Sequence, residues 1–233
     1  MTTKNIMASK KLTKKEKKEE AYAKLNLYTR DGKLIFKIGD EPTVKEFESL
    51  IGEEMIHVAD CVLNTEQNYP IKLKKDGTPC KRQREYLTDS EDYDYDGKKI
   101  DYKGCHESWD NKNAEWLYTL VYNGHIVKIG MTIKSLKERY ESYSCGTSRN
   151  MRKGSCSTTN FIISECNYVA KKNGITVEIY GIKCEYERRP MTRFGITEII
   201  PYSTVRGQET MLTKVFNNKY NHLPVLCVQS GNN

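Results

Sequence analysis

The stretch that decides the fold is residues 116–143, which read WLYTLVYNGHIVKIGMTIKSLKERYESY. Two short apolar runs flank an Asn-Gly pair at 123–124, and this pair between such runs is the strongest short-range signal for a β-hairpin. Beyond Gly130 the apolar residues recur at helical spacing, at Ile133, Leu136, Tyr140 and Tyr143. The stretch therefore predicts two antiparallel strands followed by a helix.

The motifs within this stretch resemble those of the GIY-YIG nuclease superfamily. Residues 117–119 (LYT) correspond to the first triplet and residues 128–130 (KIG) to the second, and Arg139 lies on the helix that follows. The first triplet keeps only its tyrosine. The second begins with Lys, which is similar to some restriction endonucleases of the family and to certain phage and viral members. The resemblance covers roughly residues 115–225.

The resemblance implies an α+β fold in which a small mixed or antiparallel sheet with a central hairpin is flanked by helices. The nuclease domain would occupy residues 113–233. We expect a charged N-terminal tail at residues 1–25. Residues 26–112 would form an N-terminal extension, which is a candidate DNA-binding region.

The resemblance also implies a catalytic role for four residues of the hairpin and helix. Tyr118 would be the general base that activates water, and Lys128 would be the cation that makes its phenolate accessible, since an unperturbed tyrosine has a pKa near ~10. Arg139 would bind the scissile phosphate through its guanidinium fork. Tyr143 would position the same phosphate.

A metal-binding glutamate on a later helix completes the family pattern. Glu209 fills that place and would hold a single divalent cation, Mg²⁺ or Mn²⁺, with several retained waters. Asn221 lies twelve residues further on and would position Glu209. The implied activity is a metal-dependent endonuclease that hydrolyses phosphodiester bonds in DNA, of the restriction or phage and viral kind.

The charge distribution favours a polyanionic partner for the C-terminal half. Residues 1–112 hold 22 Lys/Arg and 22 Asp/Glu, whereas residues 113–233 hold 16 and 9. Because phosphate contacts supply most of the sequence-independent affinity for nucleic acid, this surplus suits DNA, and duplex DNA in particular. The candidate contacts are Arg149, Arg152, Lys153, Arg188, Arg189 and Arg193. The sequence leaves open whether the protein is a monomer or a homodimer.

Two other function classes stay open. One is a protein that keeps the fold to bind DNA or RNA without cutting it, and the other is an RNA-directed nuclease, which would share every residue named above. The candidate catalytic residues could also have purely structural roles. Tyr118 and Tyr143 would be core aromatics, and Lys128 would be a surface residue with a buried stem.

We expect an intracellular protein, cytoplasmic or, in a eukaryotic host, nuclear. No run approaches the ~18 apolar residues of a membrane span, and the N-terminus lacks a secretory apolar core. The eight cysteines form no Cys-x-x-Cys pair, and only Cys105-His106 places two soft ligands together. Free thiols are therefore expected, with several of them buried, and neither a structural zinc site nor a disulfide framework is predicted.

Residues 27–39 (LYTRDGKLIFKIG) repeat the hairpin motifs and form a rival site. Nine residues after Gly39 stands Glu48, where Arg139 follows Gly130 by the same interval. A carboxylate there would repel a phosphate, so we expect a hairpin without chemistry, with a substrate-positioning role as the alternative.

Other segments carry weaker signals. Residues 9–24 predict a frayed or solvated helix, with a nucleic-acid or localisation role for its lysines as the alternative. Residues 72–84 are basic, and residues 92–97 match the first half of a calcium loop before the pattern fails at Lys99 and Lys103. We interpret both as solvated loops, with substrate binding and calcium as the alternatives.

Further elements follow along the C-terminal half. Ser157 to Thr159 predict the cap of a helix that ends at residues 171–174, and residues 175–186 predict a strand. The last helix is expected from about residue 206 to 220. Its apolar stripe would comprise Met211, Leu212, Val215 and Phe216.

The register of the central hairpin decides whether Tyr118 and Lys128 can act together. Regular pairing around a two-residue turn would place Tyr118 opposite Ile129 and point Lys128 to the other face of the sheet. A three-residue turn would place Tyr118 directly opposite Lys128. We expect this turn, or an equivalent one-residue bulge elsewhere in the hairpin.

Overall fold

The computed structural model describes residues 13–63, 76, 99–184 and 186–227. Its strands are β1 (Thr29–Arg30), β2 (Lys33–Leu34), β3 (Ile56–Leu63), β4 (Ile100–Gly104), β5 (Glu115–Tyr122), β6 (His125–Thr132), β7 (Val177–Cys184), β8 (Glu187–Arg193) and β9 (Ile196–Tyr202). Its α-helices are α1 (Lys14–Leu25), α2 (Val44–Ile51), α4 (Leu136–Ser144), α5 (Ser148–Lys153), α6 (Thr158–Lys172) and α7 (Val205–Tyr220). Two short 3₁₀ helices are η1 (Ile38–Asp40) and η2 (Glu107–Asp110).

The principal sheet has five strands in the order β4-β3-β7-β5-β6, and every neighbouring pair is antiparallel. The predicted α+β class with an antiparallel sheet is confirmed. The hairpin β5–β6 lies at one edge of this sheet. Strands β3 and β4 come from the segment expected to be an extension, so the boundary expected at residue 113 cuts through one sheet and does not separate two folding units.

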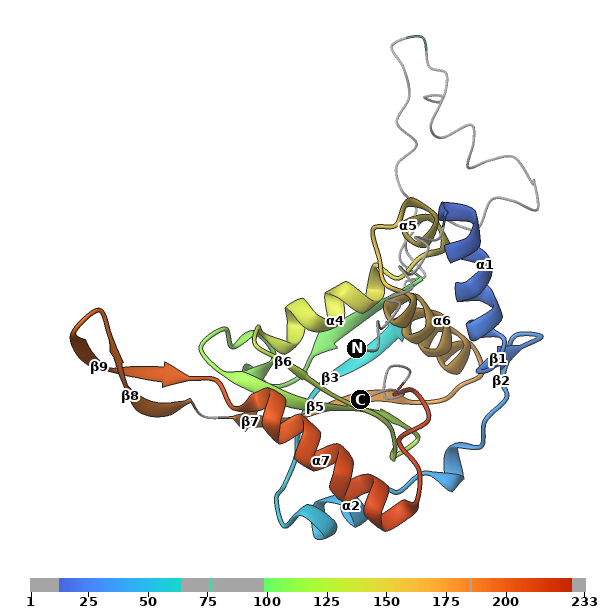
Figure 1. The fold of residues 1–233 in the computed structure, drawn as a ribbon. Coiled ribbons are helices and arrows are strands. Elements are labelled where there is room, and N and C mark those ends of the chain that lie inside the picture. Colours follow the sequence, from blue (N-terminus) through green and yellow to red (C-terminus); the bar gives the residue numbers. More distant parts are fainter. Residues whose placement is uncertain (1–12, 64–75, 77–98, 185, 228–233) are drawn as a thin grey trace, which may run out of the picture.

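Helices cover both faces of the sheet (Figure 1). One face packs against α1, α4, α5 and α6, with Leu136, Tyr140 and Phe161 fully buried there. The other face packs against α2 and α7 through Phe47 and Phe216. Strand β5 is buried along its whole length because both of its faces are covered.

The hairpin turn combines a two-residue turn with a bulge. Tyr122 pairs with His125, and the turn residues have φ values of 46° at Asn123 and 83° at Gly124, as a type I′ turn requires. The prediction of a three-residue turn was therefore wrong. The register then shifts, since Val121 pairs with Ile126 and the next pair is Leu120 with Lys128, so the alternative of a one-residue bulge is confirmed.

The N-terminal helix is docked, contrary to the expectation of a frayed or solvated segment. Ala21 and Leu25 of α1 are buried. The ring of Tyr22 lies 5.2 Å from that of Phe161 in α6, and its hydroxyl shares a hydrogen bond of 2.7 Å with Ser148 Oγ. Three inward positions on one face are enough for docking even though most of the helix is charged.

The repeat at residues 27–39 forms the expected small hairpin, β1–β2, with a turn at Asp31 and Gly32. Glu48 lies in α2 and accepts a hydrogen bond from the backbone N–H of Met55 (2.8 Å). The half calcium loop at 92–97 and most of the basic stretch at 72–84 lie outside the described residues. No helix among the residues that the structure describes is long and apolar enough to cross a membrane.

The remaining predicted elements are confirmed, with two corrections. Ser157 caps α6, and β7 and α7 fall where the sequence placed them. In α7, Leu212 and Phe216 are buried, but Met211 is 67% exposed, so the apolar stripe is narrower than predicted. Ile133 is also exposed, because it precedes the N-cap Ser135 and is not part of α4.

Phe216 anchors α7 to α2, its ring lying 5.6 Å from that of Phe47. We expect Phe216→Ala to lower the free energy of unfolding by about 3–5 kcal/mol, because it removes a fully buried aromatic side chain. Met211→Ala on the same helix is the matched control and should change it by less than about 0.5 kcal/mol. Urea denaturation measures the free energy of unfolding of both variants. An equal decrease in the two would contradict the burial of Phe216 against Phe47.

Candidate active site

Three side chains from β5 and α4 form one hydrogen-bonded group. Tyr118 and Tyr143 share a hydrogen bond of 2.7 Å between their hydroxyls. Arg139 donates from Nε to Tyr118 Oη at 2.9 Å and from a terminal nitrogen to Tyr143 Oη at 2.8 Å. The guanidinium carbon also lies 4.5 Å from the centre of the Tyr143 ring. The two phenol oxygens therefore hold the guanidinium in one orientation.

Local sequence explains how α4 delivers Arg139 to this place. Ser135 caps the helix by accepting a hydrogen bond from the N–H of Glu138. Leu136, Tyr140 and Tyr143 are buried on the sheet side. Tyr140 packs edge-on against both Tyr118 and Tyr143, so the helix is held at a fixed height over β5.

Gly130 makes room for Tyr118. The two residues are directly paired across β5 and β6, and a Cβ atom at position 130 would lie 2.5 Å from Tyr118 Oη. The glycine of the KIG triplet is thus required by the close approach of a ring. Lys128 pairs with Leu120, so the predicted direct pairing of Tyr118 with Lys128 is wrong. Residues two apart on a strand share a face, however, and the bulge still places both side chains on the same face.

A cavity of about 450 Å³ joins this group to Glu209. It is lined by residues of β5, β6, α4, α6, α7 and the C-terminal segment, and among them are Tyr118, Lys128, Arg139 and Glu209. Tyr143 adjoins it through its hydrogen bonds. The structure therefore brings five of the six predicted catalytic residues together.

Burial dominates the protonation of Tyr118. Removal of the Tyr118 phenol from water raises its pKa well above the usual range, and the neighbouring Tyr143 raises it further. Lys128 and Arg139 lower the same pKa. The net shift is upward. Lys128 therefore acts in the expected direction but offsets only part of the desolvation of a fully buried phenol, and its role in making the phenolate accessible stays a prediction.

Glu209 is the carboxylate among the residues that line this cavity. Burial raises its pKa, and Lys128, Arg139 and Arg206 oppose that shift. A hydrogen bond with the backbone of Met131 also stabilises the charged form. One carboxylate in a roomy polar cavity fits Mg²⁺, which commonly keeps several waters and takes one or two protein carboxylates besides substrate phosphates.

Asn221 does not meet Glu209. It is the C-cap of α7, in left-handed conformation with φ 61°, whereas Glu209 is near the start of the same helix. Twelve residues of α-helix separate them by about 18 Å. The positioning role expected for Asn221 is wrong, since a rigid helix keeps its two ends apart.

The basic candidates lie on two other elements. Arg149, Arg152 and Lys153 belong to the short helix α5. Arg188, Arg189 and Arg193 lie on β8, whose hairpin with β9 projects from the body of the molecule (Figure 1). Arg189 pairs with Glu187 and lies 4.7 Å from the Tyr202 ring centre.

Sequence reasoning missed several residues of the cavity. Thr210 and Thr213 of α7 line it together with Thr159 of α6. The C-terminal segment closes one side, since the N–H of Leu226 donates to Val127 O at 2.8 Å and Lys128 Nζ donates to Leu226 O at 3.5 Å. Thr210 and Thr213 follow Glu209 by one and four residues in α7, so their place near Glu209 could have been predicted from the sequence. No sequence signal predicts that residues 225–227 return to β6.

No family model and no curated protein sequence matches the chain. Two nucleases resemble it among solved structures. Restriction endonuclease HPY188I in complex with product DNA has a TM-score of 0.45 at 23% identity, over 87% of this chain and 97% of that one. A mutant of bacteriophage T4 EndoII has a TM-score of 0.41 at 20% identity, over 76% of this chain and 96% of that one.

The contact between Gly130 and Tyr118 can be tested by adding one methyl group. We expect Gly130→Ala to lower the free energy of unfolding by about 1–3 kcal/mol, because the new Cβ atom overpacks a buried ring. The matched control is Gly39→Ala in the second KIG triplet, where a Cβ atom meets nothing within 4 Å. Chemical denaturation gives the free energy of unfolding of both variants. If that of Gly130→Ala were unchanged, the Tyr118 ring would not lie against position 130.

Proposed function

We propose that the protein is a divalent-metal-dependent endonuclease that hydrolyses phosphodiester bonds in DNA. The observation that supports this most is the single cavity shared by Tyr118, Lys128, Arg139 and Glu209. It combines a candidate base, two cations and a candidate metal ligand. Hydrolysis of a phosphodiester needs these roles at one place.

Arg139 would bind the scissile phosphate. Its guanidinium is half-buried and aligned by two phenol oxygens. A pre-aligned fork loses little freedom when it binds a phosphate, and its charge stabilises the phosphorane that develops during attack. Lys128, which is 7% exposed, supplies a second positive charge on the same side.

Tyr118 would take the proton of the attacking water. The bond from the water oxygen to phosphorus forms as the bond from phosphorus to the leaving oxygen breaks. Because burial keeps the phenol protonated in the free protein, its own proton must first leave to solvent. We infer that the phenolate forms only transiently, with Lys128 and Arg139 as its stabilising charges.

Glu209 would hold the divalent cation, which, when bound, stabilises negative charge on the leaving oxygen. Lys128, Arg139 and Arg206 near Glu209 oppose metal binding, because their positive charges repel a divalent cation and compete with it for the carboxylate. A bound phosphate would offset those cations. Metal affinity should therefore be higher with DNA present than without it.

The projecting hairpin β8–β9 would contact the DNA backbone. Every residue of the two strands is exposed except Ile200, which is half-buried. A two-stranded ribbon is narrow enough to enter a groove of duplex DNA. Arg188 and Arg193 are exposed on it. Lys153 at the end of α5 offers a further exposed charge.

Digestion of several substrates tests this proposal and separates it from its alternatives. We expect the purified full chain to cleave duplex DNA with Mg²⁺ or Mn²⁺ and to lose the activity when the metal is chelated. Cleavage of RNA alone would favour the RNA-directed nuclease. Binding of DNA with every substrate left intact would favour the non-cleaving protein.

Glu209→Ala is the control for the metal role in the same assay. We expect it to abolish cleavage while much of the DNA affinity remains, because basic residues away from Glu209 supply that affinity. Gel-shift measurements at fixed salt report the affinity. Equal loss of both properties would identify Glu209 as a folding residue.

The chain supplies its own matched pair for the tyrosine. We expect Tyr118→Phe to abolish cleavage, since it removes the phenol oxygen that faces Arg139, and Tyr28→Phe in the other LYT triplet to leave it unchanged. Tyr28 is half-buried against the core and does not line the cavity. Initial rates measure both variants. If Tyr28→Phe abolished cleavage and Tyr118→Phe did not, the active site would lie at residues 27–39.

A further inference from the structure

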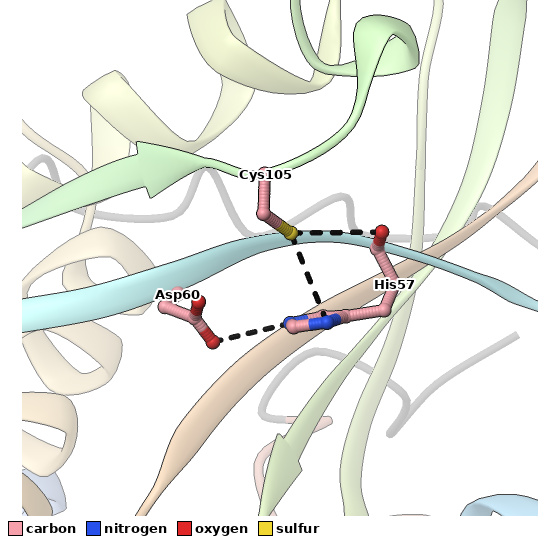
Figure 2. Close-up of side chains that lie close together, drawn as sticks. All are labelled: His57, Asp60 and Cys105. Carbon is pink, nitrogen blue, oxygen red and sulfur yellow. Dashed lines mark hydrogen bonds and ion pairs between the residues drawn. The ribbon is translucent and has the colours of Figure 1, made fainter.

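A second group of ligand-type side chains lies on β3 and just beyond β4. His57 pairs with Tyr180, but the next pair is Ala59 with Ile179, so β3 carries a bulge at Val58. In a regular strand, residues 57 and 60 would point to opposite faces. The bulge turns His57 and Asp60 to the same side (Figure 2).

Cys105 completes the group from the neighbouring strand. Its backbone N–H donates to the carbonyl oxygen of Val58 at 3.0 Å, so the chain after β4 is tied to the bulge itself. Its Sγ lies 3.7 Å from His57 Nδ1, and His57 Nε2 lies 3.1 Å from Asp60 Oδ1. One ligand atom from each of the three residues falls within 4.8 Å of the others.

The environment keeps the group ordered and open to solvent. The His57 ring is stacked on Tyr180 with 5.0 Å between ring centres. The side chains of His57 and Asp60 are 35% and 49% exposed, and Cys105 is exposed. An ion can therefore reach all three residues from water.

The donor set selects a class of ion. One imidazole nitrogen, one carboxylate oxygen and one thiolate suit Zn²⁺ and related transition metals, whereas Mg²⁺ prefers oxygen alone. Bonds of about 2.0–2.3 Å place tetrahedral ligand atoms about 3.4–3.8 Å apart. Ligand atoms that lie within 4.8 Å of one another must therefore move closer by up to about 1 Å, with one of the two His57 ring nitrogens binding the ion. A neutral histidine with two anionic ligands also balances the charge of a divalent ion.

A nucleophilic role fits the same residues less well. Cysteine, histidine and aspartate lie in the order of a catalytic triad, but burial and the charge of Asp60 raise the pKa of Cys105. A reactive thiol needs the opposite shift. Metal binding removes this obstacle, because a coordinating thiol is deprotonated by the ion.

We propose that His57, Asp60 and Cys105 form a site for one thiophilic divalent transition metal ion such as Zn²⁺, with water as the fourth ligand. On binding, the Cys105 thiol releases its proton to solvent. The ion would clamp the bulge of β3 to the end of β4. Tyr180 pairs with Thr119 of β5, the neighbour of Tyr118, so the site lies on the opposite face of the sheet from Tyr118 and is independent of the proposed cleavage.

Co²⁺ is the probe, added to the full reduced chain. We expect one equivalent to give the sulfur-to-cobalt charge-transfer absorption of a thiolate ligand and the intense visible bands of a four-coordinate ion. Zn²⁺ should displace it, whereas excess Mg²⁺ should not. Cys105→Ser should abolish the charge-transfer band, and the matched control Cys156→Ser, on the other face, should keep it.

Thermal unfolding gives a second measurement that does not need cobalt. We expect Zn²⁺ to raise the Tm of the unaltered chain, because an ion bound only to the folded state stabilises it. His57→Gln should remove that increase while leaving the metal-free Tm close to the original. Absence of the thiolate band, its survival in Cys105→Ser, or an equal increase in Tm in His57→Gln would each overturn the proposal.

Discussion

The candidate active site depends on a register shift of one residue between β5 and β6. If every residue of β5 and β6 paired without this bulge, Lys128 would lie opposite Thr119 and point to the α2 and α7 face, and Tyr118 would lie opposite Ile129. The shift places Gly130 opposite Tyr118, and only a residue without a Cβ atom leaves room for the ring there. The bulge and the glycine therefore act as one constraint on the position of the tyrosine.

Burial and charge oppose each other at the tyrosine that this constraint fixes. The sheet and α4 remove Tyr118 from water, and this raises its pKa more than Lys128 and Arg139 lower it. The same two cations stabilise the charged form of Glu209. Lys128 and Arg139 both line the cavity, and their positive charges attract an incoming anion such as a phosphate.

The same backbone device appears on the other face of the sheet. The bulge in β3 turns His57 beside Asp60, as the bulge in β6 turns Lys128 beside Tyr118. The two groups differ in chemistry, since one offers a lone carboxylate among cations and the other offers nitrogen, oxygen and sulfur. Bulges commonly re-aim side chains at functional sites, and here they serve two kinds of proposed metal site at different strands of one sheet.

The sequence by itself determined the local elements and the order of the candidate active-site residues. The Asn-Gly turn, the cap at Ser157 and the periodicity of α6 and α7 depend on neighbouring residues, so they could be predicted. The choice of Tyr118, Lys128, Arg139 and Glu209 came from motif order. Tertiary structure alone decided that Ala21 and Leu25 dock, that Met211 is exposed, and that His57 and Cys105 meet across 48 positions of chain. Local periodicity fixes which residues share a face, but long-range strand pairing decides what that face lies against.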